Sequence, residues 1–267
     1  MTTIPPILLV GLGRMGGAML AGWRERGLAP SVAVDPAPAS AVLAGADLTV
    51  VAEPGAIPAG FAPALIVLAI KPQTAAAALP AYAGLAAQAG VLSIMAGRTI
   101  GGIRALLGGG AVVRAMPNTP AAVRQGITVA CPGPGVGEAQ RALCDTLLAA
   151  IGEVAWVEDE ALLDPVTAVS GSGPAYVFLL AELMEQAAIA QGIPAALARR
   201  LARRTISGSG ALMEASAEDA AALRVAVTSP AGTTERALQV LMAPEAWPAS
   251  VARAIAAATA RSRELAG

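Results

Sequence analysis

The chain has 267 residues, a formal net charge of −1 and no histidine. A nearly neutral charge gives no electrostatic footprint for nucleic acid, and the lack of histidine excludes a histidine-based triad, proton shuttle or metal site. Cys131 and Cys144 are too few for a zinc site or a disulfide framework. We therefore expect two buried thiols and no metal.

The sequence carries no evident signal for export or for a membrane. Its longest apolar run, residues 64–70, is much shorter than the roughly 20 residues that a membrane-spanning helix needs. The first residues lack a basic segment followed by a long apolar one. We expect a soluble, cytoplasmic protein that binds neither membrane nor nucleic acid.

The first predicted element is a buried strand over residues 7–10, followed by a glycine-rich loop and a helix to about residue 26. The loop reads Gly11-Leu12-Gly13-Arg14-Met15-Gly16, which is G-x-G-x-x-G between a strand and a helix. Glycines at these positions permit a tight turn and a close approach to a pyrophosphate. The loop is predicted to bind a dinucleotide; the alternative is a glycine-rich turn without a ligand.

Asp35 follows the second predicted strand, residues 31–34. An acid about twenty residues after the glycines commonly accepts hydrogen bonds from the adenosine ribose, and its charge disfavours a 2′-phosphate. This position favours NADH over NADPH. An aspartate before Pro36 is equally typical of a turn, so both interpretations stay open.

The rest of the first half alternates between short apolar runs and helical segments. Such alternation predicts a Rossmann-type, doubly wound parallel sheet, which we expect as a dinucleotide-binding domain over residues 1–158. The further strands are expected at residues 48–51, 65–70, 91–95, 111–116, 127–130 and 153–157, and the further helices at 74–87, 100–107 and 136–150.

Polar residues follow two of these strands. Lys71, the only lysine of the chain, comes directly after residues 65–70, and Asn118 follows residues 111–116. Ligands bind at the carboxyl ends of strands in doubly wound sheets. We expect Lys71 to position cofactor or substrate; the alternative is a solvated loop residue.

Strand patterns stop after about residue 158, and an all-helical domain is predicted over residues 159–267. Helices are expected at residues 174–191, from 193 onward with an interruption or kink at 207–210, from about 235, and at 247–265. Their wide apolar faces predict packing against a second copy. The arginines of the second helix indicate a solvated or subunit-facing surface: Arg199, Arg200, Arg203 and Arg204.

The segment Ser170-Gly171-Ser172-Gly173 precedes Pro174, which suits the first turn of a helix. We expect a loop whose N–H groups, together with the helix N-terminus, bind an anion such as a carboxylate. The alternative is a glycine-rich turn before a core helix.

Five segments together match a known family in order and spacing: Gly11–Gly16, Lys71–Gln73, Arg114–Ala121, Ser170–Tyr176 and Thr228–Thr234. The chain resembles the pyrroline-5-carboxylate reductases over essentially its whole length. The resemblance implies reduction of 1-pyrroline-5-carboxylate to L-proline, the last step of proline biosynthesis, by a homodimer or a larger homo-oligomer built from dimers. It implies NADPH or NADH as cofactor; the family more often uses NADPH. One departure is Ala231, where the family usually has glycine.

The resemblance also implies site residues. Thr234 is the expected catalytic residue, with its hydroxyl beside the ring nitrogen of the substrate. The expected substrate-binding residues are Ser170, Gly171, Ser172, Gly173, Ser229, Gly232, Thr233 and Thr234. The expected cofactor-binding residues are Gly11, Leu12, Gly13, Arg14, Met15, Gly16, Asp35, Ala69, Lys71, Pro72 and Asn118. No metal is expected.

Two other functions fit the same layout. One is a β-hydroxyacid dehydrogenase type of reductase, although that class uses a lysine in its helical domain and this chain has none beyond Lys71. The other is a dinucleotide-binding regulator without catalytic activity, which would not need the polar loop at residues 228–234.

Overall fold

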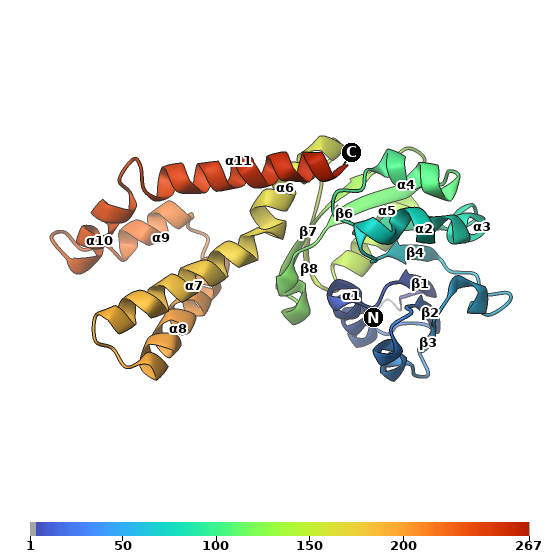
Figure 1. The fold of residues 1–267 in the computed structure, drawn as a ribbon, viewed down its shortest axis with the longest axis horizontal. Coiled ribbons are helices and arrows are strands. Elements are labelled where there is room, and N and C mark those ends of the chain that lie inside the picture. The colour runs from blue at the N-terminus through green and yellow to red at the C-terminus, as the bar shows by residue number, and fades with distance from the viewer. Residues whose placement is uncertain (1–3, 267) are drawn as a thin grey trace. The chain divides into compact units, whose positions relative to one another are not determined.

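The computed structural model describes residues 4–266 and divides the chain into two compact units (Figure 1). One unit comprises residues 1–171 together with 258–267, and the other comprises residues 172–257. The domain boundary after residue 158 stays a prediction.

The first unit is built on one sheet, coloured blue to green in Figure 1. Its strand order is β3-β2-β1-β4-β5-β6-β7-β8, the doubly wound arrangement that the alternation predicts. The strands are β1 (Ile7–Val10), β2 (Ser31–Val34), β3 (Leu48–Val51), β4 (Leu65–Leu68), β5 (Gly90–Ser93), β6 (Val112–Met116), β7 (Gly126–Pro132) and β8 (Gly152–Trp156).

The sheet is parallel except between β6 and β7, which pair antiparallel. The predicted doubly wound parallel sheet is therefore confirmed, with one antiparallel pair within it. Residues 117–125 connect the two strands, and a parallel crossover needs a dozen or more residues. The short connection thus favours an antiparallel return.

Helices cover both faces of the sheet. Side chains alternate along β1, so that Ile7 and Leu9 lie in one core cluster and Leu8 and Val10 lie in the other. The first cluster packs under α1 (Arg14–Glu25) and α5 (Glu138–Leu148), and the second under α2 (Ala75–Ala78), α3 (Ala83–Ala86) and α4 (Ile100–Leu107). The expected helix over residues 74–87 is divided between α2 and α3 by a 3₁₀ turn, because Pro80 has no N–H to donate.

The second unit is helical. It contains α7 (Gly173–Ala190), α8 (Ala195–Ala215), α9 (Ala220–Ala226), α10 (Thr233–Leu241) and the first part of α11 (Trp247–Ala266). The short connection over residues 191–194 makes α7 and α8 a hairpin, as Figure 1 shows. An interruption of the helix at residues 207–210 is wrong, because α8 runs through them; a kink there stays a prediction. A glycine inside a helix costs only about 1 kcal/mol relative to alanine, which surrounding helical residues can offset.

The expected loop at Ser170–Gly173 is wrong as well. After α6 (Leu163–Val166) the chain forms a π-helical turn over Thr167–Gly171, and α7 begins directly after Ser172. The hydroxyls of Thr167 and Ser170 donate to the carbonyls four residues earlier, at 2.6 and 3.0 Å. These bonds satisfy the side chains within a helix rather than in a loop.

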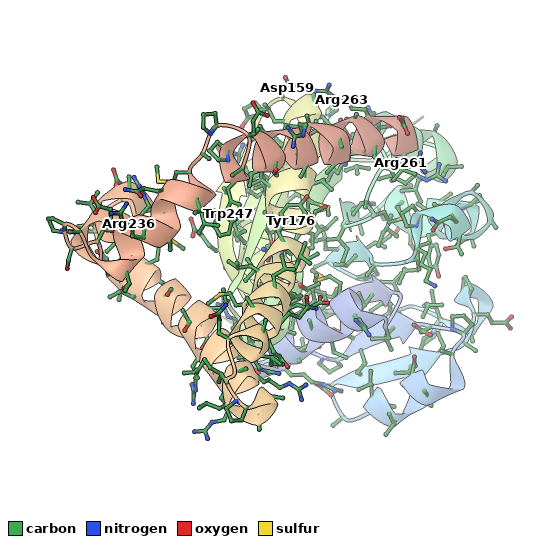
Figure 2. The ribbon with its side chains drawn as sticks, turned by 60° about the vertical axis from the view of Figure 1, so that its left-hand side comes forward. Asp159, Tyr176, Arg236, Trp247, Arg261 and Arg263 are labelled. Atoms are coloured by element: carbon green, nitrogen blue, oxygen red, sulfur yellow. The ribbon has the colours of Figure 1, made fainter. Side chains whose placement is uncertain are left out.

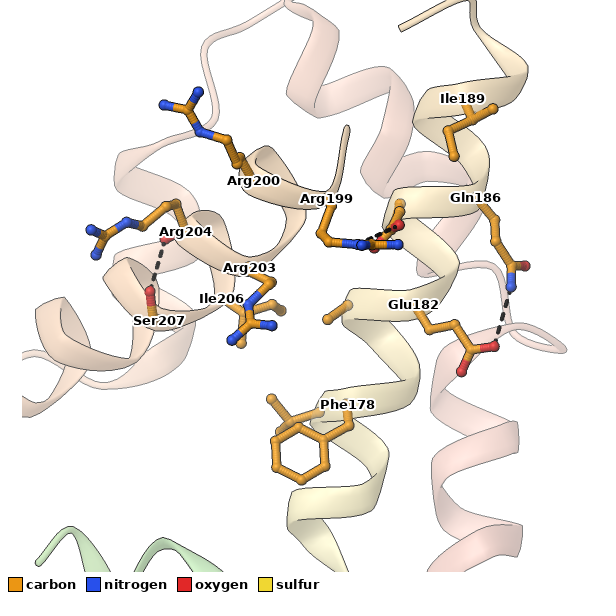
Figure 3. A pocket seen from close by; sticks show the side chains of 13 residues that line it. Phe178, Glu182, Gln186, Ile189, Arg199, Arg200, Arg203, Arg204, Ile206 and Ser207 are labelled. Atoms are coloured by element: carbon orange, nitrogen blue, oxygen red, sulfur yellow. Dashed lines mark hydrogen bonds and ion pairs between the residues drawn. The ribbon is translucent and has the colours of Figure 1, made fainter. Parts of the chain in front are cut away.

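An open groove of about 920 Å³ lies between α7 and α8. Its apolar side includes Phe178, which is 66% exposed. Arg199 extends from α8 towards α7, as Figure 3 shows, and its Nε lies 3.0 Å from Glu185 Oε1. The other arginines of the groove are Arg200, Arg203 and Arg204.

A second groove, of about 380 Å³, lies between α7 and α11 within the helical unit. Its lining is mostly apolar and includes Tyr176 and Trp247, which are labelled in Figure 2.

The helical stretch over residues 160–190 is long and apolar enough to cross a membrane by length and composition alone. The two grooves thus leave α7 with extensive uncovered apolar surface.

Candidate active site

The glycine loop joins the end of β1 to α1. Gly11 has φ +101°, and a Cβ there would lie 2.7 Å from the carbonyl oxygen of Ala69. At Gly16 a Cβ would lie 2.2 Å from the carbonyl oxygen of Gly11. Only glycine therefore fits at these two positions.

Gly13 faces open space, since nothing lies within 4 Å of the position a Cβ would take. It is the N-cap residue of α1, and no side chain caps that helix. The first N–H groups of α1 are thus left for another acceptor, next to exposed Arg14 and half-buried Met15. This uncapped N-terminus fits a pyrophosphate, so the loop suits a dinucleotide cofactor.

Asp35 lies directly against this loop. Its Oδ2 accepts from the N–H of Leu12 at 2.6 Å, and its Oδ1 accepts from the N–H of Ala37 at 2.8 Å. The second bond is the turn interaction that the alternative interpretation predicts. A role toward the ribose stays a prediction.

Lys71 begins a 3₁₀ turn after β4, and its side chain is exposed. The carbonyl oxygen of Pro72 accepts from both Nε and one terminal nitrogen of Arg98, at 3.0 and 2.8 Å. Arg98 therefore fixes the turn that carries Lys71. Sequence reasoning missed Arg98, although its place shortly after β5 is a signal of the same kind as that of Lys71.

Asn118 is buried at the end of β6, and its Oδ1 accepts from the N–H of Ile127 at 3.0 Å. This bond holds the turn into β7. Met116 packs against Gly171, where a Cβ would lie 2.7 Å from the methionine methyl group. The structure thus brings the π-helical turn, with Ser170 and Gly171, next to the end of β6.

Glu160 is a second residue that the sequence did not single out. Its Oε1 accepts from the N–H of Ile100 at 2.8 Å and from buried Arg114 at 2.9 Å. One carboxylate oxygen therefore links the start of α4, the middle of β6 and the segment that leads to the π-helical turn.

The remaining expected residues lie in the helical unit, around the start of α10. The N–H of Gly232 donates to the carbonyl of Ser229 at 3.0 Å, which closes a tight turn. Ala231 has φ +57°, and its N–H donates to Glu235 Oε2 at 2.8 Å. The helix begins at Thr233, and its N-cap, Gly232, provides no side-chain cap.

Thr234 is therefore the second residue of α10 and does not cap it. The expected helix start near Glu235 is wrong by two residues, because the turn at Ser229–Gly232 lets the helix begin earlier. Uncapped N–H groups and the hydroxyls of Thr233 and Thr234 thus lie together at one helix N-terminus. Such a group of donors can bind a carboxylate and hydrogen bond to a neighbouring polar atom.

Neither cysteine is paired, and both are buried. Among residues 4–266 no group of three or more histidine, cysteine, aspartate or glutamate side chains is arranged to hold a metal ion.

Two family models match the chain. Residues 160–265 match the pyrroline-5-carboxylate reductase dimerisation model, and residues 6–97 match the model of coenzyme F420-dependent NADP oxidoreductases. The second match covers the glycine loop and Lys71, and the first covers the π-helical turn and α10.

Relatives and solved structures agree with these matches. A pyrroline-5-carboxylate reductase from Pseudomonas aeruginosa is 40% identical, covering 98% of this chain and 97% of its own. One from Coxiella burnetii has a structure with a TM-score of 0.89 at 29% identity, over 99% of both chains. A Plasmodium falciparum pyrroline carboxylate reductase with NADP bound has a TM-score of 0.84 at 25% identity, over 100% of both chains. The chain belongs to the pyrroline-5-carboxylate reductase family.

Proposed function

We propose that the chain is an NAD(P)H-dependent oxidoreductase that reduces 1-pyrroline-5-carboxylate to L-proline, the last step of proline biosynthesis. The observation that carries the proposal is the uncapped N-terminus of α10, where two threonine hydroxyls stand beside free N–H donors. It is supported by the likeness to reductases of this name over nearly the whole chain.

The cofactor is held by residues at the carboxyl edge of the sheet. Gly11 and Gly16 allow the backbone to approach the pyrophosphate, which the first N–H groups of α1 bind. Leu12, Gly13, Arg14 and Met15 complete the loop, while Ala69, Lys71, Pro72 and Asn118 line the ends of β4 and β6. The reduced nicotinamide supplies the hydride that reaches C5 of the cyclic imine.

The substrate is held at the start of α10. Its carboxylate accepts from the uncapped N–H groups at the start of α10, those of Thr233 and Thr234, where the helix dipole favours a negative charge. Thr234 hydrogen bonds to the ring nitrogen and so orients the imine. Ser170, Gly171, Ser172 and Gly173 are assigned as further substrate-binding residues. A protonated imine is already electrophilic, so orientation and electrostatics suffice without a histidine acid or base.

One assay separates this function from its two alternatives. Cofactor oxidation is followed with 1-pyrroline-5-carboxylate, with a β-semialdehyde acid, and with no carbonyl or imine substrate. The proposed activity gives turnover only with the first. Turnover with the second identifies a β-hydroxyacid dehydrogenase type of enzyme, and nucleotide binding without turnover identifies a regulator.

The protein works as a homodimer or a larger homo-oligomer. Support comes from the dimerisation model over residues 160–265 and from the exposed apolar surface of α7 within it. For this reason we assign the apolar stretch 160–190 to contacts between copies rather than to a membrane. Sedimentation of Phe178→Asp should show dissociation, whereas Val42→Asp, which replaces an apolar residue 83% exposed in the first unit, should leave the assembly intact.

The proposed location is the cytoplasm. Cys131 and Cys144 are free thiols, and free thiols persist in a reducing compartment. The small-molecule substrate requires neither nucleic acid nor membrane as a partner.

A further inference from the structure

The end of β2 presents a carboxylate with unused acceptor capacity. Asp35 Oδ2 accepts from Leu12 and Oδ1 accepts from Ala37, so both oxygens are fixed by backbone N–H groups. A carboxylate has about four lone-pair sites. Each oxygen therefore keeps a site for another donor, and the side chain is only half-buried.

The chain segment around the end of β2 carries no lysine or arginine side chain. Residues 27–70 contain no lysine or arginine. Glu53 follows the end of β3, which pairs with β2, whereas Asp47 lies next to the start of β2, at the other edge of the sheet. This segment includes β2, β3 and the connections that follow them. A dianionic 2′-phosphate at the end of β2 would find negative charges here and no positive one from the segment.

The nearest preceding arginines are already engaged. Arg24 donates through Nε and a terminal nitrogen to Asp47, at 2.6 and 2.9 Å, and the same terminal nitrogen donates to the carbonyl of Leu43 at 2.7 Å. This ion pair lowers the pKa of Asp47. Arg26 donates to the carbonyl of Ala149. Asp47 adjoins the start of β2, and Gly27, next to Arg26, bonds to Ile4 before β1. Both arginines therefore lie at the amino edge of the sheet, and their partners hold them away from the end of β2.

Together these charges favour one of the two cofactors at the end of β2. We propose that this chain binds NADH in preference to NADPH and that Asp35 determines the preference; the proposal rests on the proposed function. The free acceptor sites of Asp35 receive the ribose hydroxyls of NADH, as acids at this place in doubly wound folds do. A 2′-phosphate would meet the same carboxylate as a like charge, which disfavours binding.

Arg14 is assigned a different role. It is the first residue of α1 and is exposed beside the glycine loop. At a helix N-terminus it adds to the positive potential that holds the pyrophosphate, which both cofactors share. Arg14→Gln should therefore weaken the binding of NADH and of NADPH by the same factor.

The test measures binding rather than turnover. Isothermal titration of the full-length chain gives the Kd of NADH and of NADPH for wild type and for Asp35→Asn. Asparagine keeps an oxygen that can accept from Ala37 and removes the charge. Glu153→Gln is the control for net charge, because Glu153 is exposed on β8 at the opposite edge of the sheet. Melting curves check that each variant is folded.

Wild type should bind NADH about tenfold or more tightly than NADPH, and Asp35→Asn should reduce that ratio by about tenfold, mainly through tighter NADPH binding. Glu153→Gln should keep the wild-type ratio. Three results would each overturn the inference while leaving the proposed function standing. They are tighter binding of NADPH than of NADH by wild type, an unchanged ratio of the two Kd values in Asp35→Asn, and a selective loss of NADPH binding in Arg14→Gln. Failure of wild type to bind either nucleotide would instead contradict the proposed function.

Discussion

The hydroxyl of Ser262 donates a 2.6 Å hydrogen bond to Asp164 Oδ1, and both side chains are buried. The two residues are 98 positions apart in the chain. Ser262 lies in the last part of α11 and Asp164 lies in α6, so the bond fastens the end of α11 to the first unit. Leu265 packs closely against Gly97 nearby, because a Cβ added at Gly97 would lie only 2.9 Å from the Cβ of Leu265.

Removing this hydroxyl should destabilise the protein. Ser262→Ala leaves a buried acceptor on Asp164 without its donor, which costs about 1–3 kcal/mol. Urea unfolding monitored by circular dichroism measures the change. Ser250→Ala is the matched control, because Ser250 is exposed on the same helix and should change stability by less than about 0.5 kcal/mol. Equal effects of the two substitutions would show that the buried bond contributes nothing specific.

The hydroxyl of Thr234 should matter for turnover. A hydrogen bond to a charged or charge-developing nitrogen contributes roughly 1.5–3 kcal/mol, so Thr234→Ala should lower kcat/KM by about 10- to 150-fold. Cofactor affinity should stay nearly unchanged. Steady-state kinetics with 1-pyrroline-5-carboxylate and a nucleotide titration measure both quantities.

Two neighbouring variants control for this substitution. Thr234→Ser keeps the hydroxyl and should keep most of the activity, and Thr233→Ala should be milder than Thr234→Ala. Thr234 makes no N-cap bond in α10, so a melting temperature close to that of wild type is expected for Thr234→Ala. A lowered melting temperature with normal kinetics would remove Thr234 from the catalytic residues.

Replacing Ala231 by glycine should stabilise the folded protein. Its φ of +57° is the left-handed conformation, which costs a residue with a Cβ about 1–2 kcal/mol. Glycine avoids this cost but loses more backbone entropy on folding. Ala231→Gly should therefore raise stability by up to roughly 1 kcal/mol, as measured by thermal unfolding. A destabilised variant would mean that rigidity of this turn outweighs its strain.

Alkaline pH should weaken the fold through Cys144. Burial, with a smaller contribution from the charge of Asp145, raises the pKa of this thiol from 9.0 to about 12. The unfolded chain therefore loses the proton first, so stability is unaffected below pH 9 and falls between pH 9 and about 12. Urea midpoints at pH 8 and pH 10.5 measure the fall.

Cys144→Ala is the control for the pH effect. It removes the titrating group, so its stability should fall less over the same interval, although its stability at pH 8 is lower because of the lost side-chain volume. Equal falls in the two proteins would assign the alkaline loss to other groups. Tyr82 is one such group, since burial raises its pKa to about 12 as well.

Sequence patterns determined local elements well where the signals were local. The bounds of α4 follow from Thr99, whose hydroxyl accepts from the N–H of Gly102, and from Gly108 with φ +75° at the other end. The reversal at β7, the continuous α8 and the π-helical turn at Thr167–Gly171 were missed. The short connection over residues 117–125 is visible in the sequence, but the pairing of β7 with β6 is not. The contact between Met116 and Gly171 joins residues that are distant in the chain.

The same limit applies to the site. The glycine loop, Asp35 and Lys71 stand out in the sequence because each comes soon after an apolar strand, and their binding roles stay predictions. Glu160 follows no such pattern, and its role depends on Arg114, which is distant in the chain. The place of Arg98 after β5 is a signal in the sequence, but its bond to the carbonyl of Pro72 is not. Their contribution is to hold other residues in place, and only the contacts show it.

The bond between Ser262 and Asp164 also has a consequence for the order in which the protein forms during synthesis. Residues 1–171 leave the ribosome first, but residues 258–267 belong to the same compact unit and are made only after residues 172–257. At about 5–20 residues per second, that intervening stretch takes roughly 4–17 seconds. The sheet can assemble in that interval, yet Asp164 must wait for its donor, so the first unit to begin folding is completed only after the whole of the second has been made.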